Sequence, residues 1–249
     1  MIVDRRGFMA SVGAAALAAN SPARAEGRRV KAIAFDVFTI FDPRSITAAA
    51  EARLPGKGEA LAALWRNRQF EYCWLRTLYG NYTDFWRVSE EALSFAGKSL
   101  KLELDGPTRA ALMQALVEIG PWPDSVGALR RLREAGVRLA YLSVMTPHML
   151  ETVSKRAGVG DLFEFKLSTD AVRAFKPDPR AYAMAERAFQ LPRAEIVFAA
   201  FGGWDAGGAK SFGLETFWVN RLGAAREELG VAPDAEGPTL DDLAKYVQA

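Results

Sequence analysis

Short apolar runs that alternate with helical segments are the feature that most constrains the fold of this chain. The first run, 30–36 (VKAIAFD), is apolar almost throughout, as is typical of a buried parallel strand. Similar runs follow at 137–143, 165–168, 195–201 and 215–220. Helical patterns lie between them at 125–135, 147–157, 179–190 and 205–212. Because strands and helices alternate, the sequence predicts an α/β fold with a doubly wound parallel sheet and right-handed crossovers.

Polar residues stand at the ends of three of these predicted strands. Asp36 ends the first run, Ser143 ends the second, and Asp205 follows the fourth run after a Gly-Gly-Trp turn. The carboxyl ends of parallel strands meet at one edge of a doubly wound sheet, where such folds place their chemistry. We therefore expect these three side chains to lie close together.

The stretch between 43 and 120 does not follow the strand and helix alternation. It is helical, it interrupts the first crossover, and Pro121 and Pro123 mark its exit. The sequence therefore predicts a core built from 30–42 and 121–249, with an inserted helical cap at 43–120. The cap is rich in aromatic side chains: Trp65, Phe70, Tyr72, Trp74, Tyr79, Tyr82, Phe85 and Trp86. Most are expected to fill the interior of the cap, and a few to line an apolar pocket anchored by an arginine.

Residues 1–25 have the pattern of an export signal. Arg5 and Arg6 precede an Ala-rich apolar run, and Ala23-Arg24-Ala25 has the small-x-small spacing of a cleavage site. The paired arginines are typical of a twin-arginine signal. The apolar run is too short for a membrane span, which needs about 20 residues. The sequence therefore predicts a periplasmic protein with no membrane segment in its mature form.

Composition excludes several classes of function. Half of the residues are apolar and the formal net charge is only +2, without long charge runs, which argues for a globular chain with no nucleic-acid surface. The single cysteine and single histidine, Cys73 and His148, exclude disulfide frameworks and clustered His or Cys metal sites.

Four candidate residues have both a chemical and a structural interpretation. Asp36 at a strand end is a candidate nucleophile, and Lys176 in the Phe-Lys-Pro-Asp segment can neutralise carboxylates gathered at a site. Asp205 is either a member of that site or the N-cap of the following helix. Ser143 is either a ligand-binding hydroxyl or a group that satisfies a turn. Taken one at a time, the residues leave these alternatives open.

The order of these residues resembles that of the haloacid dehalogenase (HAD) superfamily, whose HAD-like core is a Rossmann-like sheet. Within that superfamily, the chain resembles the type II, or L-2-haloacid, dehalogenases from about Ile33 to beyond Asn220. The segments 63–69, 71–76, 176–182 and 204–209 carry the likeness. The two cap segments discriminate most, because the core motifs belong to the whole superfamily.

The resemblance implies a hydrolase that needs no cofactor and acts on a small halogenated carboxylic acid. Asp36 would attack the carbon that bears the halogen, and water would then hydrolyse the resulting aspartyl ester. Arg66 would hold the substrate carboxylate and receive the halide, Lys176 would stabilise charge, and Asp205 would activate water. The remaining carried-over roles are substrate binding by Ser143 and Thr39, support by Tyr182, and an apolar wall of Phe38, Phe70, Phe85 and Trp204. The resemblance also implies a possible homodimer.

The chain departs from the family pattern in three loops. The loop after Asp36 is one residue short and lacks a glycine, which puts the role of Thr39 in question. In the second loop, Val144 stands where the family has an asparagine. In the third, residues 200–202 are Ala-Phe-Gly, where the family has Ser-Ser-Asn. These changes remove hydrogen-bond donors that the hydrolysis of the ester needs. An alternative is therefore a slow or inactive homologue that binds small carboxylic acids.

A metal-dependent phosphatase of the same superfamily is a further alternative. Such enzymes hold Mg²⁺ with acidic residues at two positions that are Phe38 and Phe201 in this chain. Phenylalanine offers no oxygen ligand, and Mg²⁺ requires several hard oxygen ligands. The sequence therefore favours metal-independent chemistry, with no metal ligands among the candidate residues.

Overall fold

The computed structural model describes residues 30–248 and is centred on a six-stranded parallel sheet with the order β3-β2-β1-β4-β5-β6. The strands are β1 (Ala32–Phe35), β2 (Arg138–Ser143), β3 (Phe165–Ser168), β4 (Ile196–Ala200), β5 (Glu215–Val219) and β6 (Ala235–Gly237). The order reverses beside β1, since the chain first builds outward through β2 and β3 and then returns to β4. Ligands of open α/β sheets bind in the crevice at such a reversal. Asp36 follows β1 at this point.

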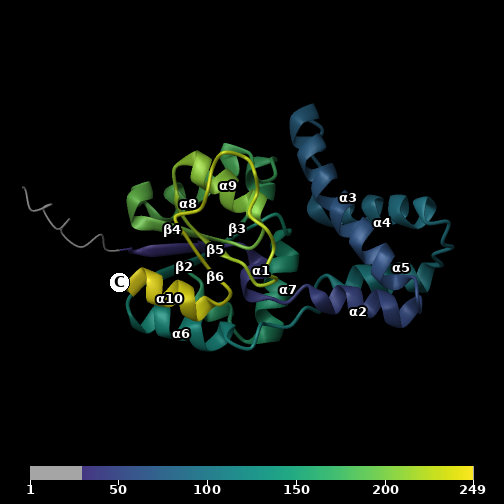
Figure 1. Cartoon of the computed structure of the whole chain (residues 1–249), viewed down its shortest axis with the longest axis horizontal. Coiled ribbons are helices and arrows are strands. Elements are labelled where there is room, and N and C mark those ends of the chain that lie inside the picture. The colour runs from purple at the N-terminus through teal and green to yellow at the C-terminus, as the bar shows by residue number, and fades with distance from the viewer. Residues whose placement is uncertain (1–29, 249) are drawn as a thin grey trace, which may run out of the picture.

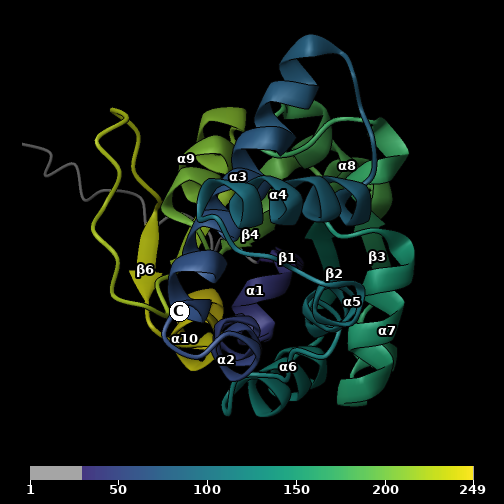
Figure 2. The same cartoon turned by 90° about the vertical axis from the view of Figure 1, so that its right-hand side faces the viewer.

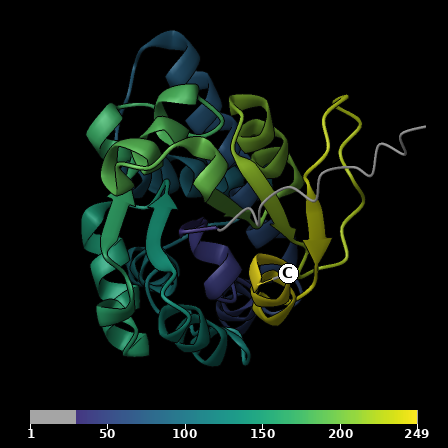
Figure 3. The same ribbon diagram turned by 90° about the vertical axis from the view of Figure 1, so that its left-hand side faces the viewer.

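Two helical layers cover the two faces of the sheet. The helices are α6 (Ser125–Glu134), α7 (Pro147–Ala157), α8 (Pro179–Phe189), α9 (Gly203–Phe212) and α10 (Leu240–Gln248). Alternate side chains of a strand point to opposite faces. Ile33 and Phe35 accordingly pack into one apolar core with α6, α7 and α10, and Ala32 and Ala34 into another with α8 and α9. Figures 1 and 3 show the two layers, and the predicted fold class is confirmed.

Four of the helices between β1 and β2 form a separate layer at the carboxyl end of the sheet. They are α2 (Arg44–Arg53), α3 (Gly58–Tyr79), α4 (Phe85–Ser99) and α5 (Gly106–Ala115). Figure 1 shows them to one side of the sheet, and Figure 2 views them end-on. The chain leaves and re-enters the core through one narrow neck, where Phe41 and Pro121 form an isolated antiparallel bridge. The amide of Asp42 donates to the carbonyl of Gly120 there, at 2.8 Å.

Several short elements were absent from the sequence prediction. They are α1 (Val37–Ile40), the edge strand β6, α10, and the 3-10 helices η1 (Gly160–Leu162), η2 (Thr169–Val172) and η3 (Arg193–Glu195). The sequence of β6 is Ala-Glu-Gly, which has no apolar run, and its pairing with β5 creates the strand. Helix α9 begins at Gly203 rather than at Asp205, and the predicted strands are up to two residues too long at their ends.

The predicted export signal at 1–25 lies outside the described residues. Among residues 30–248, no helix combines the length and apolar composition that a bilayer crossing requires. The longest described helix, α3, has 22 residues and carries charged side chains from Glu59 in its first turn to Arg76 in its last.

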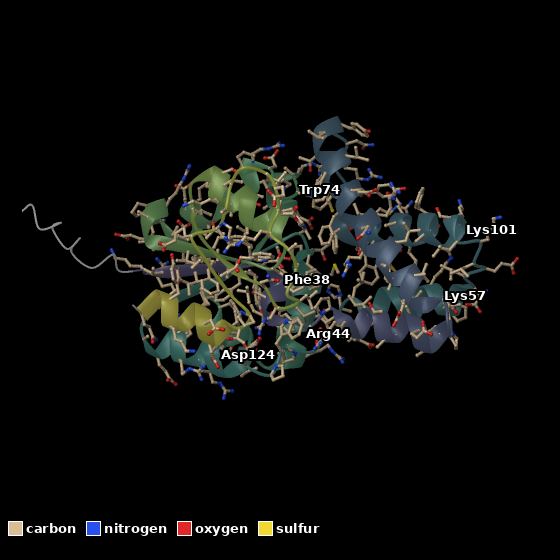
Figure 4. All side chains as sticks on the ribbon, viewed as in Figure 1. Phe38, Arg44, Lys57, Trp74, Lys101 and Asp124 are labelled. Atoms are coloured by element: carbon tan, nitrogen blue, oxygen red, sulfur yellow. The ribbon has the colours of Figure 1, made fainter. Side chains whose placement is uncertain are left out.

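Asp124 connects the neck to the C-terminal helix. One of its oxygens accepts a hydrogen bond from Nη1 of Arg221 at 2.6 Å, and the other accepts from the amide of Leu240 at 2.8 Å, at the start of α10. The side chain of Arg221 is only 3% exposed and also donates to the carbonyl of Thr39 at 2.7 Å. Asp124, labelled in Figure 4, therefore joins the neck, the end of β5 and α10.

Asp124→Ala is expected to lower the free energy of unfolding by about 3 kcal/mol, because it leaves a buried guanidinium without its carboxylate. Urea unfolding followed by circular dichroism measures the change. Asp161→Ala, which alters an exposed aspartate of η1, is the matched control and is expected to change stability by about 0.5 kcal/mol or less. Equal losses in both variants would contradict the role assigned to Asp124.

Candidate active site

Lys176 lies between two carboxylates at the carboxyl end of the sheet. Its Nζ atom is 2.6 Å from Oδ2 of Asp36 and 2.7 Å from Oδ2 of Asp205. Lys176 and Asp205 are each 1% exposed, and Asp36 is 7% exposed. The ends of β1 and β4 and the segment after β3 thus bring together two carboxylates and one ammonium in a nearly dry region.

The turn after β1 fixes the orientation of Asp36. Asp36 is the N-cap of the one-turn helix α1, and its Oδ1 accepts a hydrogen bond from the amide of Phe38 at 2.9 Å. The hydroxyl of Thr39 donates to the carbonyl of Asp36 at 2.6 Å. The shortened loop therefore still turns, and both carboxylate oxygens of Asp36 have a donor.

Burial and hydrogen bonding set the protonation of Asp205. Burial raises the pKa of the Asp205 carboxyl to about 6, although the charge of Lys176 and a 2.7 Å hydrogen bond from Tyr182 act to lower it. Burial alone would lower the pKa of Lys176, but the two carboxylates outweigh it and raise that pKa above its usual value. Lys176 is therefore an ammonium at neutral pH, while Asp205 changes protonation within the physiological range.

Helix α9 packs closely against the group that orients Asp205. A side chain at Gly208 would place its Cβ 2.5 Å from the Tyr182 hydroxyl oxygen and 2.7 Å from Cβ of Pro177. Only glycine fits this approach, which explains why the Trp-Asp-Ala-Gly-Gly segment carries a glycine there. Because α9 begins at Gly203 and has Gly202 as its N-cap, Asp205 lies inside the first turn and is not the cap.

A cavity of about 620 Å³ opens over Asp36 between the core and the helices α2 to α4. Lys176 and Asp205 line its floor, and Arg66 of α3 lines its wall. Arg66 has no ion pair or hydrogen bond to any residue within 30–248, so its guanidinium is available to a bound anion. In Figure 4, Phe38 lies at this junction of core and cap.

Aromatic side chains line much of the cavity. Phe38 and Phe201 have ring centroids 5.8 Å apart on the core side. Phe70 and Trp74 of α3 each lie 5.3 Å from the ring of Trp204 in α9. All four residues of the predicted apolar wall line the cavity: Phe38, Phe70, Phe85 and Trp204.

Three hydroxyls of the predicted site lie outside the residues that line the cavity. Ser143 is fully buried and accepts a hydrogen bond from the amide of Met145 at 3.1 Å, which is the turn-satisfying alternative. Thr39 donates to the backbone of Asp36, and Tyr182 donates to Asp205. All three hydroxyls thus bond to protein groups. The bond from Tyr182 to Asp205 agrees with its predicted supporting role, whereas Ser143 and Thr39 were predicted to contact substrate and instead bond to backbone groups.

Some lining residues were not predicted as part of the site. The sequence did indicate Trp74 as one of the aromatic residues of the cap. Its position on the cavity side of α3 depends on how the cap packs against the core, which the sequence pattern does not give. Trp218 and Leu222 line the cavity from β5 and the segment after it, where nothing in the sequence marks them.

The indole of Trp204 occupies the space beside Gly202. A Cβ at Gly202 would lie 2.8 Å from Nε1 of Trp204. A larger residue at 202 therefore requires Trp204 to move, so the missing side chain there and the position of the indole belong together.

The described residues contain no group of three or more His, Cys, Asp or Glu side chains arranged to hold a metal ion. At the two positions where the phosphatase alternative would need acids, the cavity is lined by the rings of Phe38 and Phe201. Neither ring supplies a side-chain oxygen ligand at these two positions.

Comparison with known proteins gives consistent matches. The model of a haloacid dehalogenase-like hydrolase family matches residues 30–213. An (S)-2-haloacid dehalogenase of Pseudomonas sp. (strain YL) is 41% identical over 212 residues, or 85% of this chain and 91% of that protein. The crystal structure of the L-2-haloacid dehalogenase RSc1362 is 46% identical, with a TM-score of 0.87 over 89% of this chain and 100% of that one.

A second solved structure bears on the chemistry of these relatives. The L-2-haloacid dehalogenase of Xanthobacter autotrophicus, solved with chloropropionic acid covalently bound, is 36% identical and has a TM-score of 0.82. That match covers 88% of this chain and 99% of that one. Since the family model spans most of the described residues and these relatives align over nearly their whole length, the chain belongs to the haloacid dehalogenase-like hydrolase family.

Proposed function

We propose that this protein is a metal-independent hydrolase that removes halide from L-2-haloacids through an ester of Asp36. The observation that carries the proposal is the buried Asp36–Lys176–Asp205 network on the floor of an apolar cavity. The same cavity is lined by Arg66, which has no ion-pair partner among residues 30–248. Relatives over most of the chain are (S)-2-haloacid dehalogenases, which supports this substrate class.

In the first half-reaction, a carboxylate oxygen of Asp36 forms a bond to C2 of the substrate. The bond between C2 and the halogen breaks, the electron pair leaves with the halide, and the configuration at C2 inverts. Arg66 pairs with the substrate carboxylate and takes up the leaving halide. The aromatic wall excludes water, which makes the Asp36 carboxylate more reactive.

In the second half-reaction, water adds to the carbonyl carbon of the ester. Ionised Asp205 accepts a proton from that water. The tetrahedral intermediate then collapses by breaking the bond between the Asp36 carbonyl carbon and the oxygen on C2, and that oxygen takes the proton back from Asp205. A 2-hydroxy acid leaves, and Asp36 loses its remaining proton to solvent and is again a carboxylate. Whichever oxygen of Asp36 forms the ester, the other keeps a donor, because Phe38 donates to Oδ1 and Lys176 to Oδ2. These donors stabilise the developing oxyanion.

We expect hydrolysis of the ester to limit turnover. Ala200, Phe201 and Gly202 offer no side-chain donor for the attacking water, and loss of one such donor slows a step by ~10²-fold. Rapid mixing with L-2-chloropropanoate should release one halide per site in a burst, and mass spectrometry should find the adduct on the peptide that contains Asp36.

Asp36→Asn is the control and should abolish both the burst and the adduct. The burst should be unchanged in EDTA, and its loss on chelation with recovery in Mg²⁺ would overturn metal independence. Steady turnover without a burst would show that hydrolysis is not limiting. Binding of the acid with neither halide nor adduct would identify the protein instead as an acid-binding homologue, the alternative favoured by the missing donors.

The pKa of Asp205 predicts how turnover depends on pH. Asp205 must be ionised to accept a proton, and its pKa is raised to about 6. The ester removes the negative charge of Asp36, which helps to raise this pKa in the free protein. The rate of ester hydrolysis should therefore be level above about pH 6 and fall along an acid limb that lies below it. Measurement of kcat between pH 4.5 and 8 checks this expectation.

Two tyrosine variants separate the role of Tyr182 from that of burial in general. The Tyr182 hydrogen bond lowers the pKa of Asp205, so Tyr182→Phe should move the acid limb of the pH profile to higher pH. Tyr141→Phe removes a hydroxyl from another fully buried tyrosine, which stacks on Phe163, and should leave the limb in place. Equal shifts in both variants would contradict the role given to Tyr182.

We further propose that the mature protein is periplasmic and dimeric. The export signal predicted at 1–25 supports the first point, and intact mass after secretion, with a mature N-terminus near Glu26, tests it. Leu78 and Tyr79, at the end of α3, are 79% and 73% exposed and offer an apolar surface to a second copy. A monomeric mass by light scattering would exclude the dimer.

A further inference from the structure

We propose that the preferred substrates are 2-haloacids with a bulky apolar group on C2, such as an arylmethyl group, rather than two- or three-carbon haloacids. This inference rests on the proposed function and specifies its substrate class. Three observations carry it: the size of the cavity, the contact already made by the cap, and the chemistry of the lining.

The cavity is several times larger than a three-carbon haloacid. Its volume is about 620 Å³. A molecule of about six non-hydrogen atoms fills only ~120 Å³ at the packing density of a protein interior. An arylmethyl group on C2 doubles the number of atoms and occupies space that chloropropanoate would leave to water.

The cap is already seated on the core, so the volume does not belong to a separated pair of domains. Phe70 and Trp74 of the cap contact Trp204 of the core, with ring centroids 5.3 Å apart in both pairs. On the other side of the junction, the amide of Phe175 donates to the Thr77 hydroxyl at 3.0 Å, and Tyr82 donates a hydrogen bond to Asp170. The cap thus contacts the core on both sides of the cavity, and the volume of about 620 Å³ lies between these contacts.

The charged groups of the lining leave one anchor for an acid. Lys176 is engaged by Asp36 and Asp205, Arg44 pairs with Asp42, and Glu71 pairs with Arg68. Arg66 has no such partner within the described residues, and the one acid of α3 left beside it in the lining, Glu59, lies seven residues away, or about 10 Å along the helix.

The apolar part of the lining suits a flat ring. One aromatic pair is Phe38, two residues after Asp36, with Phe201. A second cluster is Trp204, which directly precedes Asp205, with Phe70 and Trp74. Val144, Leu116 and Leu222 add aliphatic surface to the same cavity. Aromatic side chains stack or meet edge-on with a ring placed against them. A carboxylate held at Arg66 therefore leaves an apolar group on C2 in contact with aromatic walls.

The first test compares two substrates of the full mature protein. The kcat/KM for halide release should be at least ~10-fold higher for L-2-chloro-3-phenylpropanoate than for L-2-chloropropanoate, since each buried methylene is worth roughly a factor of four. A higher kcat/KM for chloropropanoate would overturn the inference while leaving the proposed function intact.

A matched pair of variants links the preference to the cavity. Ala63 and Ala60 are both exposed residues of α3, but only Ala63 lines the cavity. Ala63→Phe fills the cavity and should lower the ratio of kcat/KM for the phenyl substrate over chloropropanoate by at least ~10-fold. Ala60→Phe should leave both the ratio and the basal activity unchanged. An equal ratio in the two variants would overturn the inference.

A binding measurement separates failure of the inference from failure of the proposed function. Tryptophan fluorescence should show that 3-phenylpropanoate, which has no halogen, binds roughly 100-fold more tightly than propanoate. This preference without halide release from either haloacid would overturn the proposed function and leave the ligand class standing. Equal binding of the two acids would overturn the ligand class.

Discussion

The rest of the site depends on the ion triad of Lys176 with Asp36 and Asp205. Burying three charges is costly, and the cost is offset only because Nζ lies 2.6 and 2.7 Å from the two carboxylates. In the proposed mechanism, the triad carries one net negative charge before Asp36 is esterified and none afterwards. The ammonium of Lys176 therefore stabilises both buried carboxylates in the free protein, and it remains paired with Asp205 once Asp36 has become a neutral ester.

Much of the structure around the triad serves to hold Lys176 in place. Phe175, the preceding residue, packs against Tyr82 of the cap with ring centroids 4.9 Å apart, and its amide donates to the hydroxyl of Thr77. Pro177, the following residue, packs where a side chain at Gly208 would intrude. The cap thus contacts the segment 175–177 on one side and the core contacts it on the other. The position of the Lys176 ammonium therefore depends on how α3 packs against the core. The cap therefore both lines the cavity and helps to position Lys176.

The sequence predicted those features that depend on local periodicity and on the logic of parallel sheets. Apolar runs gave five of the six strands. The expected meeting of strand ends holds for Asp36 and Asp205, which lie on either side of Lys176 because carboxyl ends share an edge. It did not predict β6 or α10, whose formation relies on the edge of β5 and on the cap from Asp124. Ser143 was placed correctly on its strand but not at the cavity, because one turn of backbone decides which amide its hydroxyl meets.

The departures from the family pattern are linked to one another by packing. Gly202 has no side chain, and the indole of Trp204 takes up the adjacent space, with Nε1 only 2.8 Å from where a Cβ would stand. Phe201 turns its ring toward Phe38 rather than offering a hydroxyl. The same substitutions that remove donors for a hydrolytic water therefore enlarge and line the apolar wall. A bound substrate with a large apolar group would itself restrict where water can enter, so ordering of water by the substrate can replace part of what the lost side chains provided.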